Sequence, residues 1–362
     1  MQRSTENAEL RGRLLGVKLK ALVGDHLGSP PDAEPIGFPN GAGIVVDGAA
    51  WVLIDGDASA SLGPSIAWAI RHDATSLDMI VETDSGALAR RAGGLTMPIA
   101  VWFAEERTLL PVIAEELAAP PRVSDEHVAM VEMIERGGAE GVVSHGVVTG
   151  EVRGLEVCRV VDEPTIGRLA ELGDFDLTPQ MTADWNEDLG ADHSGVILEV
   201  GVGANDREAF QLLHGGVPKI EALSSVVESV RAHRSADAPQ HPLNRMARER
   251  FLLWSARQDP SLVGMAEVEP TEPPFPRPSM KQAAPSPAIG VDEAGRRRLL
   301  VFTSGVDLDV VPYGLDAHRA ARRSVEGLEE RITIVLRAAD LLPITREIAA
   351  LSATPVDFAT MD

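Results

Sequence analysis

Acidic residues in the central part of the chain stand where carboxylates could share a metal ion. Glu156 lies in the apolar stretch GLEVCRV and Glu199 in ILEVGVG, and both stretches read as strands. The amphipathic stretch before them supplies a third carboxylate, Glu135 or its neighbour Glu132. Carboxylate oxygens from neighbouring strands suit Mg²⁺, which activates water and stabilises phosphoryl charge. The alternative is that Glu156 and Glu199 point to solvent from alternating strands.

The order of a helix, a strand with Glu156, a strand with Glu199 and a helix resembles the core of the PD-(D/E)xK nucleases. The resemblance runs from about Val123 to His214. It implies that a helical Glu, an acidic residue on one strand and an E-x-K motif on the next hold a divalent metal ion. Here Gly201 takes the position of the family's lysine, so Arg207 or Lys219 would have to supply the positive charge. Glu156, Glu199 and Arg207 are thus the catalytic candidates of an active or a degenerate nuclease-like core.

The glycines of the same stretch raise the question of nucleotide binding. A dinucleotide fingerprint needs G-x-G-x-x-G between a strand and a helix. Here Gly201 and Gly203 are followed by Asp206, whose carboxylate would oppose a phosphate at the helix start. Asn205 and Glu208 fit a capping box instead. A P-loop is excluded because the chain contains no Gly-Lys pair.

A second pair of carboxylates follows a strand near the C-terminus. In SGVDLDVVP, Asp307 and Asp309 stand at the carboxyl end of an apolar run, where ligands of α/β proteins commonly bind. Continued strand alternation would place both side chains on one face, where they could hold a metal–phosphate group. The alternative, a polar turn before Pro312, is favoured. Asp307 and Asp309 are therefore weak candidates for cofactor binding.

The elements that carry these residues predict an α/β protein with mixed sheets and short helices in two blocks, followed by a C-terminal β-α-β-α-β unit. This last unit is small for an independent core, so we expect it to dock on the first block and extend its sheet. No internal repeat is evident. The predicted parts are an N-terminal helix (1–28), an α/β block (36–118), a central block (122–258) with an acidic insert (163–193), a proline-rich linker (259–298) and the C-terminal unit (299–362).

The N-terminal stretch places Leu10, Leu14 and Val17 at helical spacing, with basic residues interleaved. A basic amphipathic helix of this kind could lie on a membrane surface. Packing against the protein body is the favoured alternative, because most amphipathic helices of globular proteins bury their apolar stripe.

Composition narrows the classes of function. The net charge of -22 opposes whole-surface binding of nucleic acid or of anionic membrane. Cys158 is the only cysteine, which excludes an intrachain disulfide and a cysteine-ligated zinc site. With no apolar run of membrane-spanning length and no signal-peptide pattern, a cytoplasmic protein is expected.

Three functional hypotheses follow from the sequence. They are a divergent or degenerate metal-dependent nuclease-like protein, a non-catalytic module that binds a protein or small ligand, and a nucleotide-binding enzyme.

Overall fold

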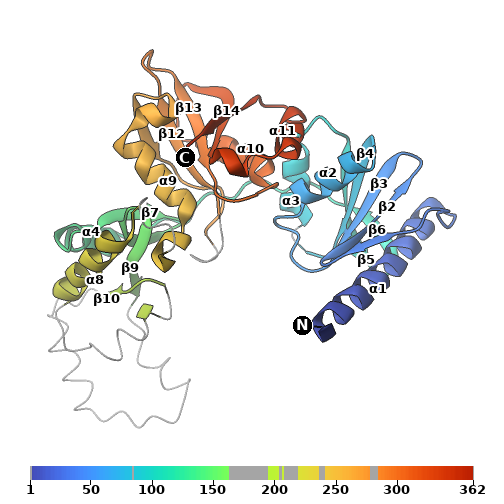
Figure 1. The fold of residues 1–362 in the computed structure, drawn as a ribbon, viewed down its shortest axis with the longest axis horizontal. Coiled ribbons are helices and arrows are strands. Elements are labelled where there is room, and N and C mark those ends of the chain that lie inside the picture. The colour runs from blue at the N-terminus through green and yellow to red at the C-terminus, as the bar shows by residue number, and fades with distance from the viewer. Residues whose placement is uncertain are drawn as a thin grey trace, which may run out of the picture. The chain divides into compact units, whose positions relative to one another are not determined.

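The computed structural model describes residues 2–83, 85–162, 195–203, 206–207, 219–235, 241–277 and 284–361. The chain divides into two compact units, which both mix helices and strands (Figure 1). The protein is therefore of the α/β class, as the sequence predicts. Unit 1 comprises Met1–Ala118, Asp259–Pro274 and Pro285–Asp362, and unit 2 comprises Ala119–Gln258 and Phe275–Ala284. Within the described ranges, no helix has the length and apolar character that a membrane span requires.

The N-terminal half of unit 1 is built around a mixed sheet, sheet A, with strand order β1-β2-β3-β4-β5-β6. β3, β4 and β5 run parallel, and the other neighbours are antiparallel. The sequences of β3 and β4 are almost continuously apolar because both faces of these strands are buried. The elements are β1 (Ile36–Phe38), β2 (Gly41–Val46), β3 (Ala49–Ile54), α2 (Leu62–Arg71), β4 (Ser76–Val81), α3 (Ser85–Ala92), β5 (Ile99–Glu105) and β6 (Thr108–Pro111).

The C-terminal half of unit 1 has its own sheet, sheet D, with strand order β11-β12-β13-β14-β15. β13, β14 and β15 run parallel, whereas β11 and β12 are antiparallel to their neighbours. The elements are η2 (Pro260–Val263), β11 (Glu267–Pro270), β12 (Ser286–Val291), β13 (Arg297–Phe302), α10 (Val310–Ala321), β14 (Leu328–Leu336), η3 (Ala338–Asp340), α11 (Pro343–Ala350) and β15 (Val356–Thr360).

Two expectations about this half are wrong. The range 259–298, predicted as a linker, contributes η2, β11 and β12 to the fold. Prolines are compatible with these strands because Pro270 ends the edge strand β11 and Pro287 stands near the start of β12. The C-terminal strands also do not extend sheet A, since they pair with one another in sheet D.

The two halves repeat one topology. β1-β2-β3-α2-β4-α3-β5 corresponds to β11-β12-β13-α10-β14-α11-β15, with the same parallel and antiparallel pairings throughout. A few residues mark the repeat. Gly56 and Gly305, both at positive φ, follow the third strand of each half, and Pro98 and Pro355 precede the last one. So few shared residues explain why no repeat is evident in the sequence.

The halves meet around an approximate twofold axis. Thr96 N donates to Leu351 O at 2.7 Å, and Ala353 N donates to Gly94 O at 3.0 Å. These two bonds flank an antiparallel bridge between Leu95 and Ser352. Leu95 stands four residues before β5 and Ser352 four residues before β15, so the chain pairs with its own repeat at equivalent positions. Such self-complementary contacts are typical of twofold homodimers.

The four helices α2, α3, α10 and α11 lie on the inner faces of the two sheets. Parallel crossovers are right-handed as a rule, so the two crossovers of each half, which advance in the same direction along the sheet, place their helices on the same face. Side chains from both sheets and all four helices then form one shared core, which includes Val52, Leu62, Ile66, Val301 and Ile334. This shared core joins the C-terminal half to the N-terminal half.

The outer face of sheet A is covered by α1 (Gln2–Leu27). Leu15, Leu19 and Leu22 of this helix are buried against Trp51 and Ile80 of the sheet. The prediction that the N-terminal helix packs on the protein body is thus confirmed. The predicted packing face is wrong at Leu10, Leu14 and Val17, which are exposed, because the buried stripe runs through Leu15, Leu19 and Leu22. On one side of the helix, Gly37 allows a close approach of β1 to the backbone of Gly12, because a Cβ at Gly37 would lie 2.8 Å from the Gly12 carbonyl oxygen.

Unit 2 contains a four-stranded antiparallel sheet, sheet C, with strand order β10-β9-β8-β7. One face packs against α4 and α8, and Ile134, Val157, Leu198 and Leu223 belong to that core. Ser124 caps α4 by accepting a hydrogen bond from the His127 amide. The elements are α4 (Asp125–Arg136), β7 (Glu140–Ser144), β8 (Val147–Val152), β9 (Leu155–Asp162), β10 (Val196–Val200), α8 (Lys219–His233), η1 (Pro242–Arg245) and α9 (Arg248–Gln258).

Candidate functional site

The two strand carboxylates of the predicted metal site do converge. Glu199 on β10 pairs with Arg159 on β9, so both side chains lie on the face of sheet C opposite the α4–α8 core. The register between β8 and β9 shifts between Gly150 and Glu151, because β9 has one extra residue there. This irregularity is a β-bulge in β9. The bulge moves Glu156 onto the same face as Arg159 and Glu199. Without it, simple alternation would place Glu156 and Arg159 on opposite faces.

An arginine occupies the place between these carboxylates. Arg207 Nη1 lies 2.7 Å from Glu156 Oε1, and Arg207 Nε lies 3.3 Å from Glu199 Oε2. Arg159 donates one bond of 3.0 Å to each carboxylate oxygen of Glu156, so Oε1 is shared with Arg207. The Arg207 side chain is only 8% exposed, so the guanidinium pairs inside the protein with Glu156, and at its other side with the 30% exposed Glu199. The pair of glutamates therefore forms an ion-pair network.

The backbone around residue 201 explains why this position holds a glycine and not the lysine of the nuclease motif. Its φ is +141°, and a Cβ on it would lie 2.9 Å from the backbone nitrogen of Arg207. Any side chain at residue 201 would collide with the turn that delivers Arg207 to the carboxylates. Arg207 N donates to Gly203 O at 3.0 Å, and Asp206 Oδ2 accepts from Val202 N at 2.8 Å, which fixes this turn. The predicted capping pair, Asn205 and Glu208, lies outside the described residues.

The third predicted ligand does not join the other two. Glu135 is exposed on α4, as is Glu132, and α4 packs on the opposite face of sheet C from Glu156 and Glu199. Lys219, the first residue of α8, belongs to the same helical layer. In the described part of the chain, no three His, Cys, Asp or Glu side chains are grouped to hold a metal ion. The metal set of Glu135, Glu156 and Glu199 is therefore not assembled.

Asp307 and Asp309 lie in the turn between β13 and α10, where each has a structural task. Asp307 Oδ1 accepts from the Asp309 amide at 2.9 Å. Asp309 turns inward, accepts from the Gly63 amide at 2.8 Å and lies 3.3 Å from Arg91 Nη1. It thereby ties the start of α10 to the start of α2. Burial raises the pKa of Asp307 and raises the pKa of Asp309 to about 6.

A buried charge cluster next to Asp309 escapes prediction from sequence. Asp316 on α10 is fully buried and accepts from Arg90 through both carboxylate oxygens, at 3.0 and 3.1 Å. Arg91 Nε adds a bond of 3.0 Å, and Arg319 another of 3.2 Å. Residues from α3 and α10 are thus fastened across the interface between the halves. The only sequence signal is the Arg-Arg pair in an otherwise small, apolar helix.

Unit 2 also buries charge for structural purposes. Arg234 has no exposed surface and donates to the backbone carbonyls of Arg153, Leu243, Met246 and Ala247 at 2.7 to 2.9 Å. A guanidinium suits this task because its donors fan out in one plane. Burial raises the pKa of Glu151, which forms an ion pair of 2.7 Å with Arg250. Arg234 thereby ties backbone segments of unit 2 together, and Arg250 neutralises the buried Glu151.

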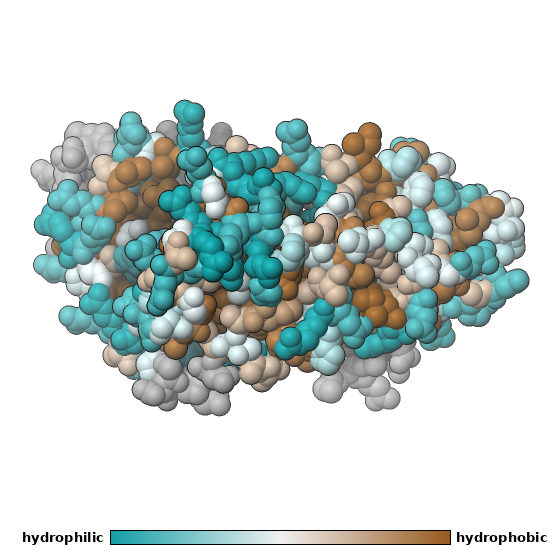
Figure 2. All heavy atoms as spheres, turned by 90° about the horizontal axis from the view of Figure 1, so that it is seen from above, coloured by the Kyte–Doolittle hydropathy of each residue, from teal (hydrophilic) through white to brown (hydrophobic). Residues whose placement is uncertain are grey.

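The outer face of α1 is the clearest unpartnered surface among the described residues. Leu10, Leu14 and Val17 are 53%, 62% and 70% exposed, although they belong to a helix that is packed on its other side. Together with Ala21 they follow the 4-3-4 spacing of a coiled-coil seam. We call these four residues the α1 seam. On the face shown in Figure 2, groups of hydrophobic side chains lie among hydrophilic ones.

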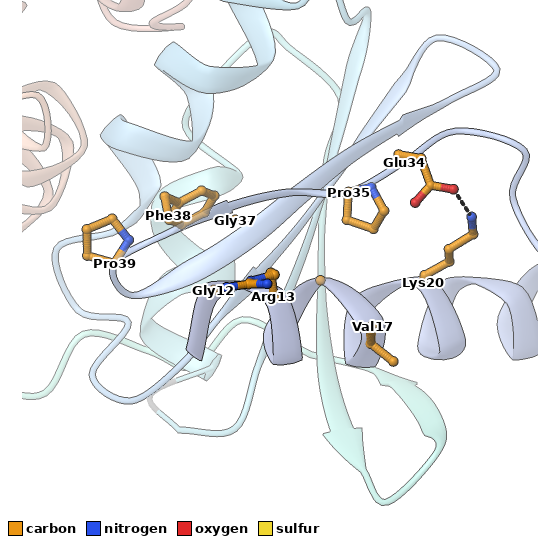
Figure 3. Close-up of a pocket in the computed structure, with 10 residues that line it drawn as sticks. Gly12, Arg13, Val17, Lys20, Glu34, Pro35, Gly37, Phe38 and Pro39 are labelled. Atoms are coloured by element: carbon orange, nitrogen blue, oxygen red, sulfur yellow. Dashed lines mark hydrogen bonds and ion pairs between the residues drawn. The ribbon is translucent and has the colours of Figure 1, made fainter. Parts of the chain in front are cut away.

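A groove of about 630 Å³ runs beside the α1 seam, between α1 and the segment that leads into β1. Gly12 and Gly16 form part of its wall, Phe38 and Pro39 lie towards one end, and the Lys20–Glu34 ion pair of 2.8 Å lies towards the other (Figure 3). Its lining is mainly apolar. Val17 belongs both to the groove and to the α1 seam, so the two features form one continuous surface.

Cations border the α1 seam on both sides. Arg11 and Lys18 follow the seam residues Leu10 and Val17 directly, and Arg13 and Lys20 precede Leu14 and Ala21. These are the e and g positions of a heptad, which choose the partner of a coiled coil by charge. No acidic residue occurs between positions 10 and 24. Three of these cations also contact the exposed or half-buried carboxylates of Asp55, Glu82 and Glu34.

A scan against models of protein families finds none that matches this chain. Searches of curated proteins and of solved structures likewise return no similar protein.

Proposed function

We propose that this protein is a non-catalytic protein-binding module and that the α1 seam with its groove binds a helix of a partner protein. The observation that carries the proposal is the exposure of Leu10, Leu14 and Val17 at coiled-coil spacing. Exposing such a stripe is costly for a monomer, and contiguous apolar surface of this kind marks interaction sites. The groove offers space for side chains of the partner that reach past Val17.

The charges beside the seam define the partner. An acidic amphipathic helix would place carboxylates opposite Arg11, Arg13, Lys18 and Lys20. A second α1 would instead bring like charges together at both edges of the seam, so self-pairing is disfavoured. The intramolecular contacts of these cations do not prevent binding, because exposed ion pairs contribute only about 0 to 1 kcal/mol and exchange easily.

A pair of designed helical peptides tests the proposal. Each peptide carries leucine at the a and d positions, with glutamate at e and g in one and lysine in the other. We expect the glutamate peptide to bind the full chain with a Kd on the order of 10 µM, more weakly at high salt, and the lysine peptide not to bind. Fluorescence anisotropy of labelled peptide measures both.

A matched pair of variants locates the binding surface. Leu14→Glu places a charge in the α1 seam, and Val306→Glu places one on an equally exposed apolar side chain of the C-terminal half, since the two are 62% and 60% exposed. Leu14→Glu should weaken the glutamate peptide at least tenfold, and Val306→Glu should leave it unchanged. Equal binding by both variants, or no binding by the wild type, would refute the proposal.

A divergent nuclease-like protein is the second candidate, because Glu156 and Glu199 do share one face of sheet C. It requires that a divalent metal ion displace Arg207 from the carboxylates. Titration with Mg²⁺ or Mn²⁺ should then raise the melting temperature of the wild type but not of Glu199→Ala. The absence of any shift, together with no cleavage of nucleic acid, would rule this candidate out.

A further inference from the structure

The repeat within unit 1 leaves one strand edge closed in the N-terminal half and open in the C-terminal half. β5 and β15 are equivalent last parallel strands. β6 pairs antiparallel with the outer edge of β5. β15 is the end of sheet D, and no other described strand pairs with its outer edge. Open edges of this kind are where sheets of different chains join.

The hydrogen bonds show which groups of β15 face this edge. Ile332 N donates to Pro355 O at 3.0 Å, and Met361 N donates to Leu336 O at 3.0 Å. In a parallel ladder, alternate residues bond to the same neighbour, so residues 355, 357, 359 and 361 face β14. Val356, Phe358 and Thr360 therefore direct their N–H and C=O groups outward. No described residue bonds these groups.

The N-terminal half shows what such an edge accepts. Leu77 N donates to Pro98 O at 3.0 Å, which is the counterpart of the bond from Ile332 to Pro355. By this correspondence Val101 is the equivalent of Phe358. The outward carbonyl of Val101 accepts from Val112 N at 2.9 Å, in the chain that continues β6. By analogy with β5, the outward N–H and C=O groups of β15 can hydrogen-bond to an antiparallel strand.

We propose that the outer edge of β15 pairs with β15 of a second copy of this chain, as an antiparallel twofold dimer. Centred on Phe358, this register pairs Phe358 with itself and Val356 with Thr360 of the other copy. Asp357 then lies opposite Ala359, so no like charges face each other directly. Asp357 is also bound to Arg331 of its own chain at 2.6 Å. β-Branched and aromatic residues, favourable in a strand, supply three of the five positions.

The dimer should be weak and should strengthen with salt. One strand pair buries little surface, so association on the order of 10 to 100 µM is expected. Each chain carries a net charge of -22, and the repulsion between two copies is screened as ionic strength rises. This salt dependence is opposite in sign to that of helix binding at the α1 seam, so the two interactions can be separated.

A proline substitution at Thr360 tests the pairing between the two β15 strands. Thr360 is exposed, and its N–H faces the open edge, so Thr360→Pro removes a donor that bonds nothing within the described chain. Thr360→Val keeps the N–H and serves as the matched control. Sedimentation velocity of the full chain is measured from about 1 to about 200 µM. Wild type and Thr360→Val should dimerise, and Thr360→Pro should weaken dimerisation at least tenfold without lowering the melting temperature.

A second measurement uses the wild type alone, so it tests the dimer even if Thr360→Pro perturbs the fold. In the wild type, amide exchange at Phe358 and Thr360 should slow as the protein concentration rises, whereas Asp357 and Ala359, which face β14, should not change. A wild type that stays monomeric over the whole range overturns the proposal. So does a dimer whose formation leaves Phe358 and Thr360 exchange unchanged, since it would use another surface.

Discussion

The two halves of unit 1 share a topology and differ in what covers their outer surfaces. Both place two helices on the inner face of the sheet and share one core. Among the described elements, the N-terminal half alone has a helix like α1 across the outer face of its sheet and a strand like β6 at the edge of its last parallel strand. The common parts explain how the unit folds. The extra helix α1 brings the α1 seam to the surface of the N-terminal half. The C-terminal half has no described counterpart of β6, so the edge of β15 is open. These two differences indicate where partners bind.

The interface between the halves is symmetric in its backbone and asymmetric in its charges. The bonds from Thr96 and Ala353 are equivalent, but Asp316 has its arginine partners on α3 only, apart from Arg319 of its own helix. A repeat that has diverged keeps the contacts made by backbone, because they do not depend on side-chain identity. The charged cluster is then a feature that fixes one half against the other.

The largest expected effect comes from breaking this charge cluster. Asp316→Ala leaves Arg90 and Arg91 buried without their main carboxylate, which should lower the free energy of unfolding by about 3 to 5 kcal/mol. Arg319→Ala removes a 43% exposed partner of the same carboxylate and should cost less than about 1 kcal/mol. Urea unfolding measures both. Equal losses would show that the cluster does not join the halves.

The two sides of α1 should respond very differently to truncation. Leu19 is fully buried against sheet A, so Leu19→Ala should cost about 2 to 5 kcal/mol. Leu14 is 62% exposed, and Leu14→Ala should change stability by less than about 0.5 kcal/mol. A large loss for Leu14→Ala would mean that the α1 seam is covered within the chain.

The pH dependence of stability tests the position of Asp309 between the halves. Its pKa is raised to about 6 from 3.8, chiefly by burial, so its contribution to stability is largest below about pH 4 and is lost as the pH rises through about 6. Asp309→Asn cannot ionise, and its amide oxygen can still accept from Gly63. The variant should therefore gain up to about 3 kcal/mol relative to the wild type between about pH 4 and 7.

Asp57 provides a control of opposite sign. Hydrogen bonds from Ser59 lower the pKa of Asp57, so its contribution is present above its ordinary pKa of 3.8 and is lost on acidification. Asp57→Asn should therefore lose stability relative to the wild type at neutral pH and not in acid. A pH-independent difference between Asp309→Asn and the wild type would contradict the buried position of Asp309.

A smaller effect is expected where α2 touches the turn before α10. A Cβ on Gly63 would overlap the carbonyl oxygen of Leu308, so Gly63→Ala should cost about 1 to 3 kcal/mol. At Gly93 the added Cβ would meet its nearest atom at 3.5 Å, and Gly93→Ala should be close to neutral. Thermal unfolding of the two variants side by side shows whether close packing holds the halves together.

The sequence predicts the elements of this fold better than their partners. The α/β class and the C-terminal β-α-β-α-β unit follow from local patterns, and both are present. The separate sheet D could not be predicted, because the pairing of distant strands depends on a core shared by both halves. The repeat is hidden because backbone geometry is retained where few residues besides Gly56, Gly305, Pro98 and Pro355 are alike.

The predicted carboxylate site shows the same limit. The sequence identifies Glu156 and Glu199 as carboxylates on neighbouring strands. It does not predict the bulge in β9 that brings both to one face, because nothing in the stretch GLEVCRV distinguishes a bulged strand from a regular one. In the sequence, Gly201 stands where the resemblance calls for a lysine. In the structure, a glycine is needed there because a side chain would collide with the backbone of Arg207. Exposure is also a property of the folded chain. The apolar spacing of Leu10, Leu14 and Val17 predicts a helix that buries this stripe, whereas the folded chain buries Leu15, Leu19 and Leu22 instead.

Amide hydrogen exchange of the full chain, with and without the glutamate-flanked helical peptide, tests the central claim most directly. A protein-binding module that acts through α1 predicts slower exchange on peptide addition in residues 10–21 and 34–39, with β9 and β10 unchanged. Protection around Glu156 and Glu199 instead, or no protection anywhere, would contradict the account.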